Sequence, residues 1–122
     1  MKMENIRQKK LADQIKKQVS QIINHKLKDP RKGFITITGV KISRDLRIAS
    51  IYFTTLGEKE QRERSRETLD RGKNFIRSEL APNLKLRFTP ELRFFYDESL
   101  EYSEHIENLL KKIHSQDSDK KE

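Results

Sequence analysis

Hydrophobic residues near the start of the chain recur with helical spacing. One apolar stripe repeats every three to four residues and consists of Leu11, Ile15, Val19, Ile22 and Ile23. This pattern predicts an amphipathic helix over roughly residues 4–28. Proline disfavours helical geometry in the residue before it, so we expect Asp29-Pro30 to end the helix.

An alternating pattern follows and predicts two strands. Residues 34–43 change phase at Gly39, where a β-bulge can absorb one extra residue. Residues 46–54 place Ala49, Ile51 and Phe53 on one face. Arg44-Asp45 lies between the two segments as a turn candidate, so we predict a β-hairpin.

A charged segment then leads into a second apolar one. Residues 58–71 hold five basic and five acidic side chains, many paired four residues apart, which predicts an exposed helix. Gly72 and Asn74 tolerate positive φ and predict a kink. A short helix carrying Phe75 is expected after it, with Phe75 in the core together with Phe53 and Phe94.

The last third of the chain is less regular. Residues 83–88 alternate apolar and basic side chains, and the pattern fits both a helical tail and an early strand. A strand is predicted over residues 91–97. For Tyr52, on the strand predicted over 46–54, base stacking and core packing are both open. We expect a domain over 1–97, an acidic helix over 98–114 capped by Asp97 and Ser99, and a disordered tail over 115–122.

Charge and composition narrow the range of functions that the sequence allows. The net charge is +8 with a pI near 9.8, and residues 1–33 hold ten basic and three acidic side chains, which favours a polyanionic partner. There is no cysteine, and the three histidines lack metal-ligand spacing, so we expect no metal and no cofactor. No apolar run approaches the roughly 20 residues of a membrane span. Turn and cap roles explain Asp29, Asp45 and Asp97. Binding in the cytoplasm, without catalysis, is the resulting expectation.

Five segments carry a resemblance to a known family. They read KKLADQIKKQVSQII, KDPRKG, ITGVKISRDLRIASIYFTTLG, NFIRSEL and LKLRFTPELRFFYDESLE. In this order and spacing the chain resembles the bacterial ribosome-binding factor A family over about residues 7–110. The resemblance implies an α+β fold: a single KH-like domain of α-β-β-α-kink-α-β order, whose three-stranded sheet packs against helices. The kink triplet is Gly72-Lys73-Asn74 here, where the family has an A-x-G kink in place of the KH G-x-x-G loop.

The resemblance also implies a function. It implies a non-enzymatic assembly factor that binds the free small ribosomal subunit and its rRNA late in maturation, assisting rRNA 5′-end processing and growth in the cold. A monomer is expected, since no long apolar seam is visible. The predicted RNA-binding residues are Arg31, Lys32, Arg44, Arg47, Lys73 and Arg77, with a secondary patch of Lys9, Lys10, Lys16 and Lys17. The alternative is a basic protein-interaction module with only generic RNA affinity.

Overall fold

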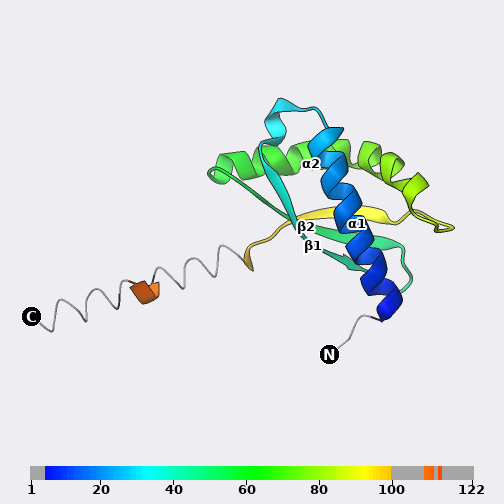
Figure 1. Ribbon diagram of the computed structural model, residues 1–122. Coiled ribbons are helices and arrows are strands. Elements are labelled where there is room, and N and C mark those ends of the chain that lie inside the picture. Colours follow the sequence, from blue (N-terminus) through cyan, green and yellow to red (C-terminus); the bar gives the residue numbers. More distant parts are fainter. Residues whose placement is uncertain (1–4, 100–108, 112, 114–122) are drawn as a thin grey trace, which may run out of the picture.

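The helices and strands follow one another in the predicted order, with one continuous helix where two joined at a kink were expected. This computed structural model describes residues 5–99, 109–111 and 113. Within that part the elements are α1 (Ile6–His25), η1 (Pro30–Lys32), β1 (Ile35–Ile42), β2 (Ile48–Thr55), α2 (Lys59–Leu80), η2 (Ala81–Asn83) and β3 (Glu91–Tyr96) (Figure 1). The α+β class is therefore confirmed, and each predicted strand differs from the observed one by at most two residues at either end.

A capping box fixes the start of α1. The Asn5 side chain accepts a hydrogen bond from the Gln8 backbone N–H at 2.8 Å, and the Gln8 side chain accepts one from the Asn5 N–H at 3.1 Å. The Gln8 amide also donates to the Ile42 carbonyl at 3.0 Å, which joins the first turn of α1 to the end of β1. The helix thus begins and ends inside the predicted range of 4–28.

The sheet has the order β1-β2-β3 and mixed pairing. β1 and β2 are antiparallel, and their register shifts between Ile37 and Gly39, so the bulge predicted at Gly39 is confirmed. β3 pairs with β2 in parallel. A parallel neighbour requires a crossover connection, and α2 with the loop after it supplies this connection.

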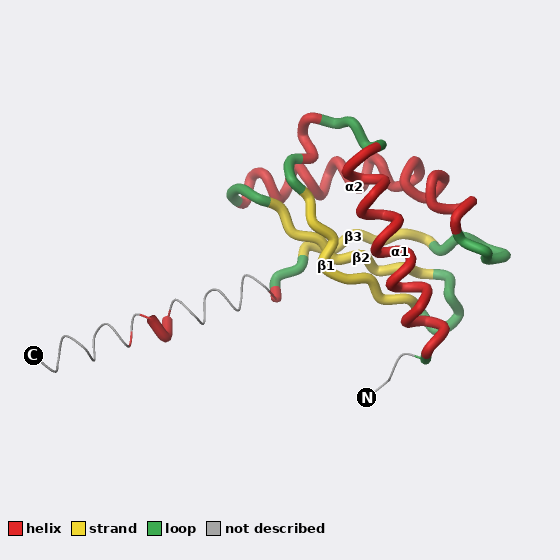
Figure 2. The backbone as a smooth tube through the Cα atoms, viewed as in Figure 1, coloured by secondary structure: helices red, strands yellow, loops and turns green. Residues whose placement is uncertain are grey.

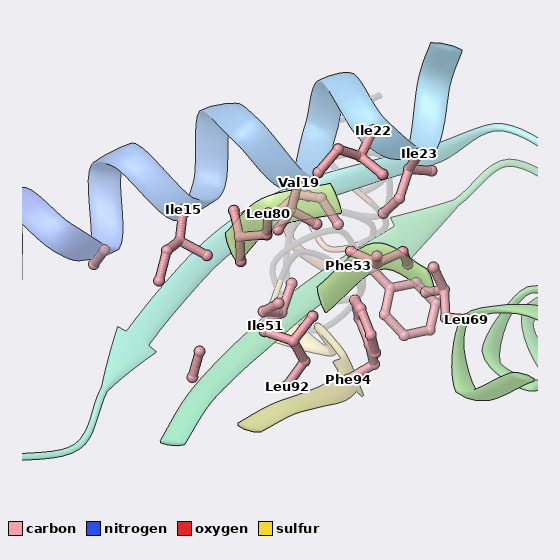
Figure 3. Packing of buried hydrophobic residues seen from close by; sticks show 14 of the residues in the cluster. Ile15, Val19, Ile22, Ile23, Ile51, Phe53, Leu69, Leu80, Leu92 and Phe94 are labelled. Carbon is pink, nitrogen blue, oxygen red and sulfur yellow. The ribbon is translucent and has the colours of Figure 1, made fainter. Parts of the chain in front are cut away.

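Both helices cover one face of the sheet. Ala49, Ile51 and Phe53 of the central strand are fully buried, as the alternating pattern predicts. Figure 3 shows the apolar side chains of α1, such as Ile15 and Val19, pointing toward these strands and toward α2. Figure 2 shows the resulting arrangement, with the sheet on one side of the two crossing helices.

The helix break predicted at Gly72 and Asn74 is wrong. α2 is assigned as one α-helix of 22 residues across these positions. Gly33 and Gly57 are the described glycines with positive φ, and Gly72 is not among them. A methyl group on Gly72 would lie 3.0 Å from the Leu27 side chain, so this glycine permits close packing against the chain after α1.

Three further expectations have different outcomes. Phe53 and Phe94 are buried, but Phe75 is 41% exposed, because it precedes Ile76, which takes the inward position on α2. Residues 84–90 are neither helix nor strand, since η2 ends at Asn83 and β3 begins at Glu91. Most of the predicted helix over 98–114, and the whole tail over 115–122, lie outside the described residues.

Candidate nucleic-acid interface

The predicted lysine patch lies on the outer side of α1. Lys9, Lys10, Lys16 and Lys17 are all exposed. Each of the pairs Lys9/Lys16 and Lys10/Lys17 is separated by seven residues, which places its members on the same side of the helix about 10 Å apart. The patch is therefore two accessible pairs of cations, of which Lys10/Lys17 lies opposite the apolar stripe and Lys9/Lys16 beside it.

The predicted basic turn contains a lysine with a structural task. The Lys32 ammonium donates to the Ile23 carbonyl at 2.6 Å and to the Leu27 carbonyl at 2.7 Å, so it caps the C-terminal end of α1. The Lys32 carbonyl in turn accepts from the Ser65 hydroxyl at 2.6 Å, which fixes η1 on α2. These bonds leave Lys32 poorly placed to hold a phosphate.

The neighbouring Arg31 is also held within the turn. Its guanidinium pairs with the Asp29 carboxylate at 3.2 Å, and Arg71 approaches the same carboxylate at 3.8 Å. The hydrogen bond from the Arg31 side chain, followed by the one from the Arg31 backbone N–H, holds the pKa of Asp29 below its usual range. Asp29 also caps η1 as predicted. The positive charge of this turn is thus partly balanced.

The residues predicted beside the kink are divided between two roles. The Arg77 guanidinium donates to the Thr89 carbonyl at 2.7 Å and to the Pro90 carbonyl at 3.1 Å, and so holds the chain just before β3. Arg77 and Asn74 line a shallow depression together with Thr89. Lys73 is half-buried, and its head group has no partner among the described residues.

The arginines of the hairpin turn, Arg44 and Arg47, are both exposed to solvent. The Asp45 carboxylate between them accepts from the Ser43 hydroxyl at 2.7 Å and from the Arg47 backbone N–H at 3.1 Å. The Ser43 bond is the main cause of the lowered pKa of Asp45, and it confirms the turn role predicted for this carboxylate. Asp45 is therefore engaged in the turn itself.

Arg47 belongs to a pocket that three separate segments form. The first turn of α1, the hairpin turn and the loop before β3 meet at this end of the molecule (Figure 1). We call it the arginine pocket; its cavity of about 160 Å³ is lined by Arg7, Asp45, Leu46, Arg47, Leu86, Arg87 and Phe88. The Arg47 guanidinium lies 4.8 Å from the centre of the Phe88 ring, and the Arg87 guanidinium lies 5.5 Å from it. Three arginines and an aromatic ring thus share one site.

Sequence reasoning missed most of this pocket. It selected Arg47 but not Arg7, Arg87 or Phe88. The available signal was the alternation of basic and apolar residues over 84–88, which could not be assigned to an element. Only the tertiary packing of three segments brings these side chains together.

The structure also bears on two other classes of site. Among the described residues, no three His, Cys, Asp or Glu side chains lie close enough to hold a metal ion. None of the helices in the described part of the chain combines the length and the apolar character of a membrane span.

Comparisons with known proteins give one family. Residues 7–110 match the family model described as Ribosome-binding factor A. The Ribosome-binding factor A of Macrococcus caseolyticus is 44% identical over 109 residues, which are 89% of this chain and 96% of that protein. The crystal structure of ribosome-binding factor A from Thermus thermophilus aligns with a TM-score of 0.65 at 27% identity, covering 73% of this chain and 94% of that one.

One further match concerns an assembly. A homology model of the Thermus thermophilus ribosome binding factor A was fitted into a cryo-EM map of a 30S complex with that factor. It aligns with a TM-score of 0.60 at 26% identity, covering 71% of this chain and 91% of that one.

Proposed function

Because the chain belongs to the ribosome-binding factor A family, we propose that it binds the free small ribosomal subunit and its rRNA during late maturation. The observation that carries the proposal is the match to the family model over residues 7–110. The Thermus thermophilus relative fitted into a map of a 30S complex supports the same partner. The proposal includes the finer roles that the resemblance implies, namely assistance of rRNA 5′-end processing, growth in the cold and action in the cytoplasm without catalysis.

The mechanism is binding through exposed cations. Lysine and arginine side chains neutralise phosphates and release condensed counterions, so the affinity falls as salt rises. The four lysines on the outer side of α1 and the arginines of the hairpin turn are the accessible candidates. Lys32 and Arg77 leave this set, because their head groups already donate to backbone carbonyls.

A second candidate function is a protein-interaction module, and one observation favours it. Phe34 is 77% exposed and Leu56 is 71% exposed. The Leu56 N–H donates to the Phe34 carbonyl at 3.3 Å, so the two apolar residues are neighbours. Such a pair suits contact with another protein, including a ribosomal protein on the same subunit.

Co-sedimentation tests the proposal. The full chain is mixed with purified small subunits, large subunits and joined ribosomes at low and moderate salt. We expect selective pelleting with free small subunits that persists at moderate salt. Equal and salt-labile binding to all three particles would contradict the proposal, and would mean that the net charge of +8 gives only generic affinity for RNA.

The finer roles need a separate readout. In cells that lack the protein, we expect small-subunit rRNA with unprocessed 5′ ends to accumulate, most strongly in the cold, and expression of the chain to reverse this. Normal 5′ ends at low temperature would overturn this part of the proposal and leave subunit binding untouched.

A further inference from the structure

We propose that the arginine pocket binds one unpaired nucleotide of RNA, with the base against Phe88 and the phosphate on the arginines. This inference rests on the proposed function, since it names the RNA element that one part of the surface recognises. The pocket lies where the hairpin turn, the loop before β3 and the start of α1 meet, away from the predicted kink.

The charges around the pocket call for an anion. Among the described residues, no carboxylate pairs with the guanidinium of Arg7, Arg47 or Arg87. The one acidic residue of the lining, Asp45, accepts its hydrogen bonds from its own turn, and its charge offsets that of one arginine, so the lining keeps a net positive charge. Guanidinium groups present several N–H donors in a planar fork that matches phosphate oxygens.

The position of Arg7 strengthens this requirement. Arg7 lies in the first turn of α1, and that turn contains no acidic residue. A helix N-terminus carries partial positive charge, so an arginine there is unfavourable unless an anion is close. The position of Arg7 therefore lowers the stability of the free protein, and a bound phosphate restores it.

The aromatic ring gives the pocket a second kind of contact. Phe88 is 54% exposed, so much of its ring surface meets solvent. Arg47 and Arg87 lie against the ring by cation–π contacts, which limits the freedom of both guanidinium groups before any ligand binds. Unpaired bases stack on aromatic rings and on guanidinium planes, whereas a paired base is not available to do so.

The size and the wall of the cavity limit what it can bind. Its volume of about 160 Å³ is too small to enclose a whole nucleotide or a large cofactor, so the pocket would hold one part of a nucleotide while the rest lies on the surface. Leu46 forms part of the wall and has φ of 62°, an unusual conformation for a residue other than glycine, asparagine or aspartate. Such local strain is often found at binding sites, because the fold must hold it in place.

Fluorescence anisotropy with a short labelled single-stranded oligoadenylate tests the inference, in parallel with small-subunit co-sedimentation. Phe88→Leu keeps apolar volume but removes the ring, and we expect roughly tenfold weaker binding in both assays with an unchanged salt slope. Phe88→Tyr should restore the affinity. Arg87→Gln should lower the salt slope by about 0.7 on the single-stranded probe.

Arg66→Gln is the matched control, because Arg66 is exposed on α2 and outside the pocket. We expect it to retain the wild-type affinity for the oligonucleotide. Wild-type affinity of Phe88→Leu, or an equal loss in Arg66→Gln, would overturn the nucleotide site. Loss of subunit binding alone, with oligonucleotide binding intact, would also overturn it and indicate a protein contact. Wild-type protein that fails to pellet with small subunits would instead refute the proposed function.

Discussion

The basic turn at residues 29–33 and the arginine pocket have similar charge but different partners. In the turn, Lys32 donates to two backbone carbonyls and Arg31 pairs with Asp29. In the pocket, Arg47 and Arg87 lie against Phe88, and no described carboxylate forms an ion pair with any of the three arginines. A cluster of cations therefore indicates a binding surface only where the fold leaves the head groups available.

The largest effect is expected where a cation caps a helix. Lys32→Met removes two charged hydrogen bonds to the Ile23 and Leu27 carbonyls, and we expect the free energy of unfolding to fall by about 2 kcal/mol. Lys28→Met, at an exposed position of the same segment, should stay within about 0.5 kcal/mol of wild type. Urea denaturation measures both. Equal stability of the two variants would remove the structural role of Lys32.

A smaller loss is expected at Arg77. Arg77→Lys keeps the charge but cannot donate to the Thr89 and Pro90 carbonyls with the same fork, so we expect a loss of about 1 kcal/mol. Small-subunit affinity should change little, because the charge remains and the head group faces the protein. A stable variant with weakened subunit binding would instead place Arg77 with the pocket arginines.

Gly72→Ala tests the backbone of α2, the helix that carries both Arg71 and Arg77. Alanine gains up to about 1 kcal/mol over glycine in a helix interior, partly offset because its methyl group meets the Leu27 side chain at 3.0 Å. We therefore expect thermal unfolding to show stability equal to wild type or slightly higher. A loss above about 1 kcal/mol would indicate that the Leu27 side chain cannot move away from the added methyl group.

The smallest effects concern the two turn carboxylates. The folded-state pKa values of Asp29 and Asp45 are lowered from 3.8, so their contribution to stability is present above that value and is lost as the pH falls below it. Asp29→Asn and Asp45→Asn should each flatten this decline in urea midpoints measured from neutral to acidic pH. An unchanged acid slope in both variants would contradict these turn bonds.

The fold follows from the sequence because its signals are local. The apolar stripe of α1, the alternation around Ile51 and the phase change at Gly39 each specify an element from adjacent residues. The prediction of a helix break failed for a physical reason. Glycine permits positive φ but also permits close packing, and only the position of Leu27 distinguishes the two uses.

The site is less predictable than the fold. Lys32 and Arg77 have the same appearance in the sequence as Arg47, yet backbone carbonyls of other segments engage the first two. Arg7 and Arg87 become neighbours only because α1 begins beside the hairpin turn, where the loop before β3 also ends. Partners of this kind depend on tertiary packing, which no local pattern encodes.

The salt dependence of small-subunit binding tests the central comparison most directly. The double variant Arg7→Gln/Arg87→Gln removes two pocket charges, and Lys59→Gln/Arg66→Gln removes two exposed charges from α2. We expect the pocket variant alone to bind more weakly, with a salt slope lower by roughly 1.4 to 1.8. Equal losses in the two double variants would contradict a specific role for the pocket arginines, and would reduce the interaction to net charge.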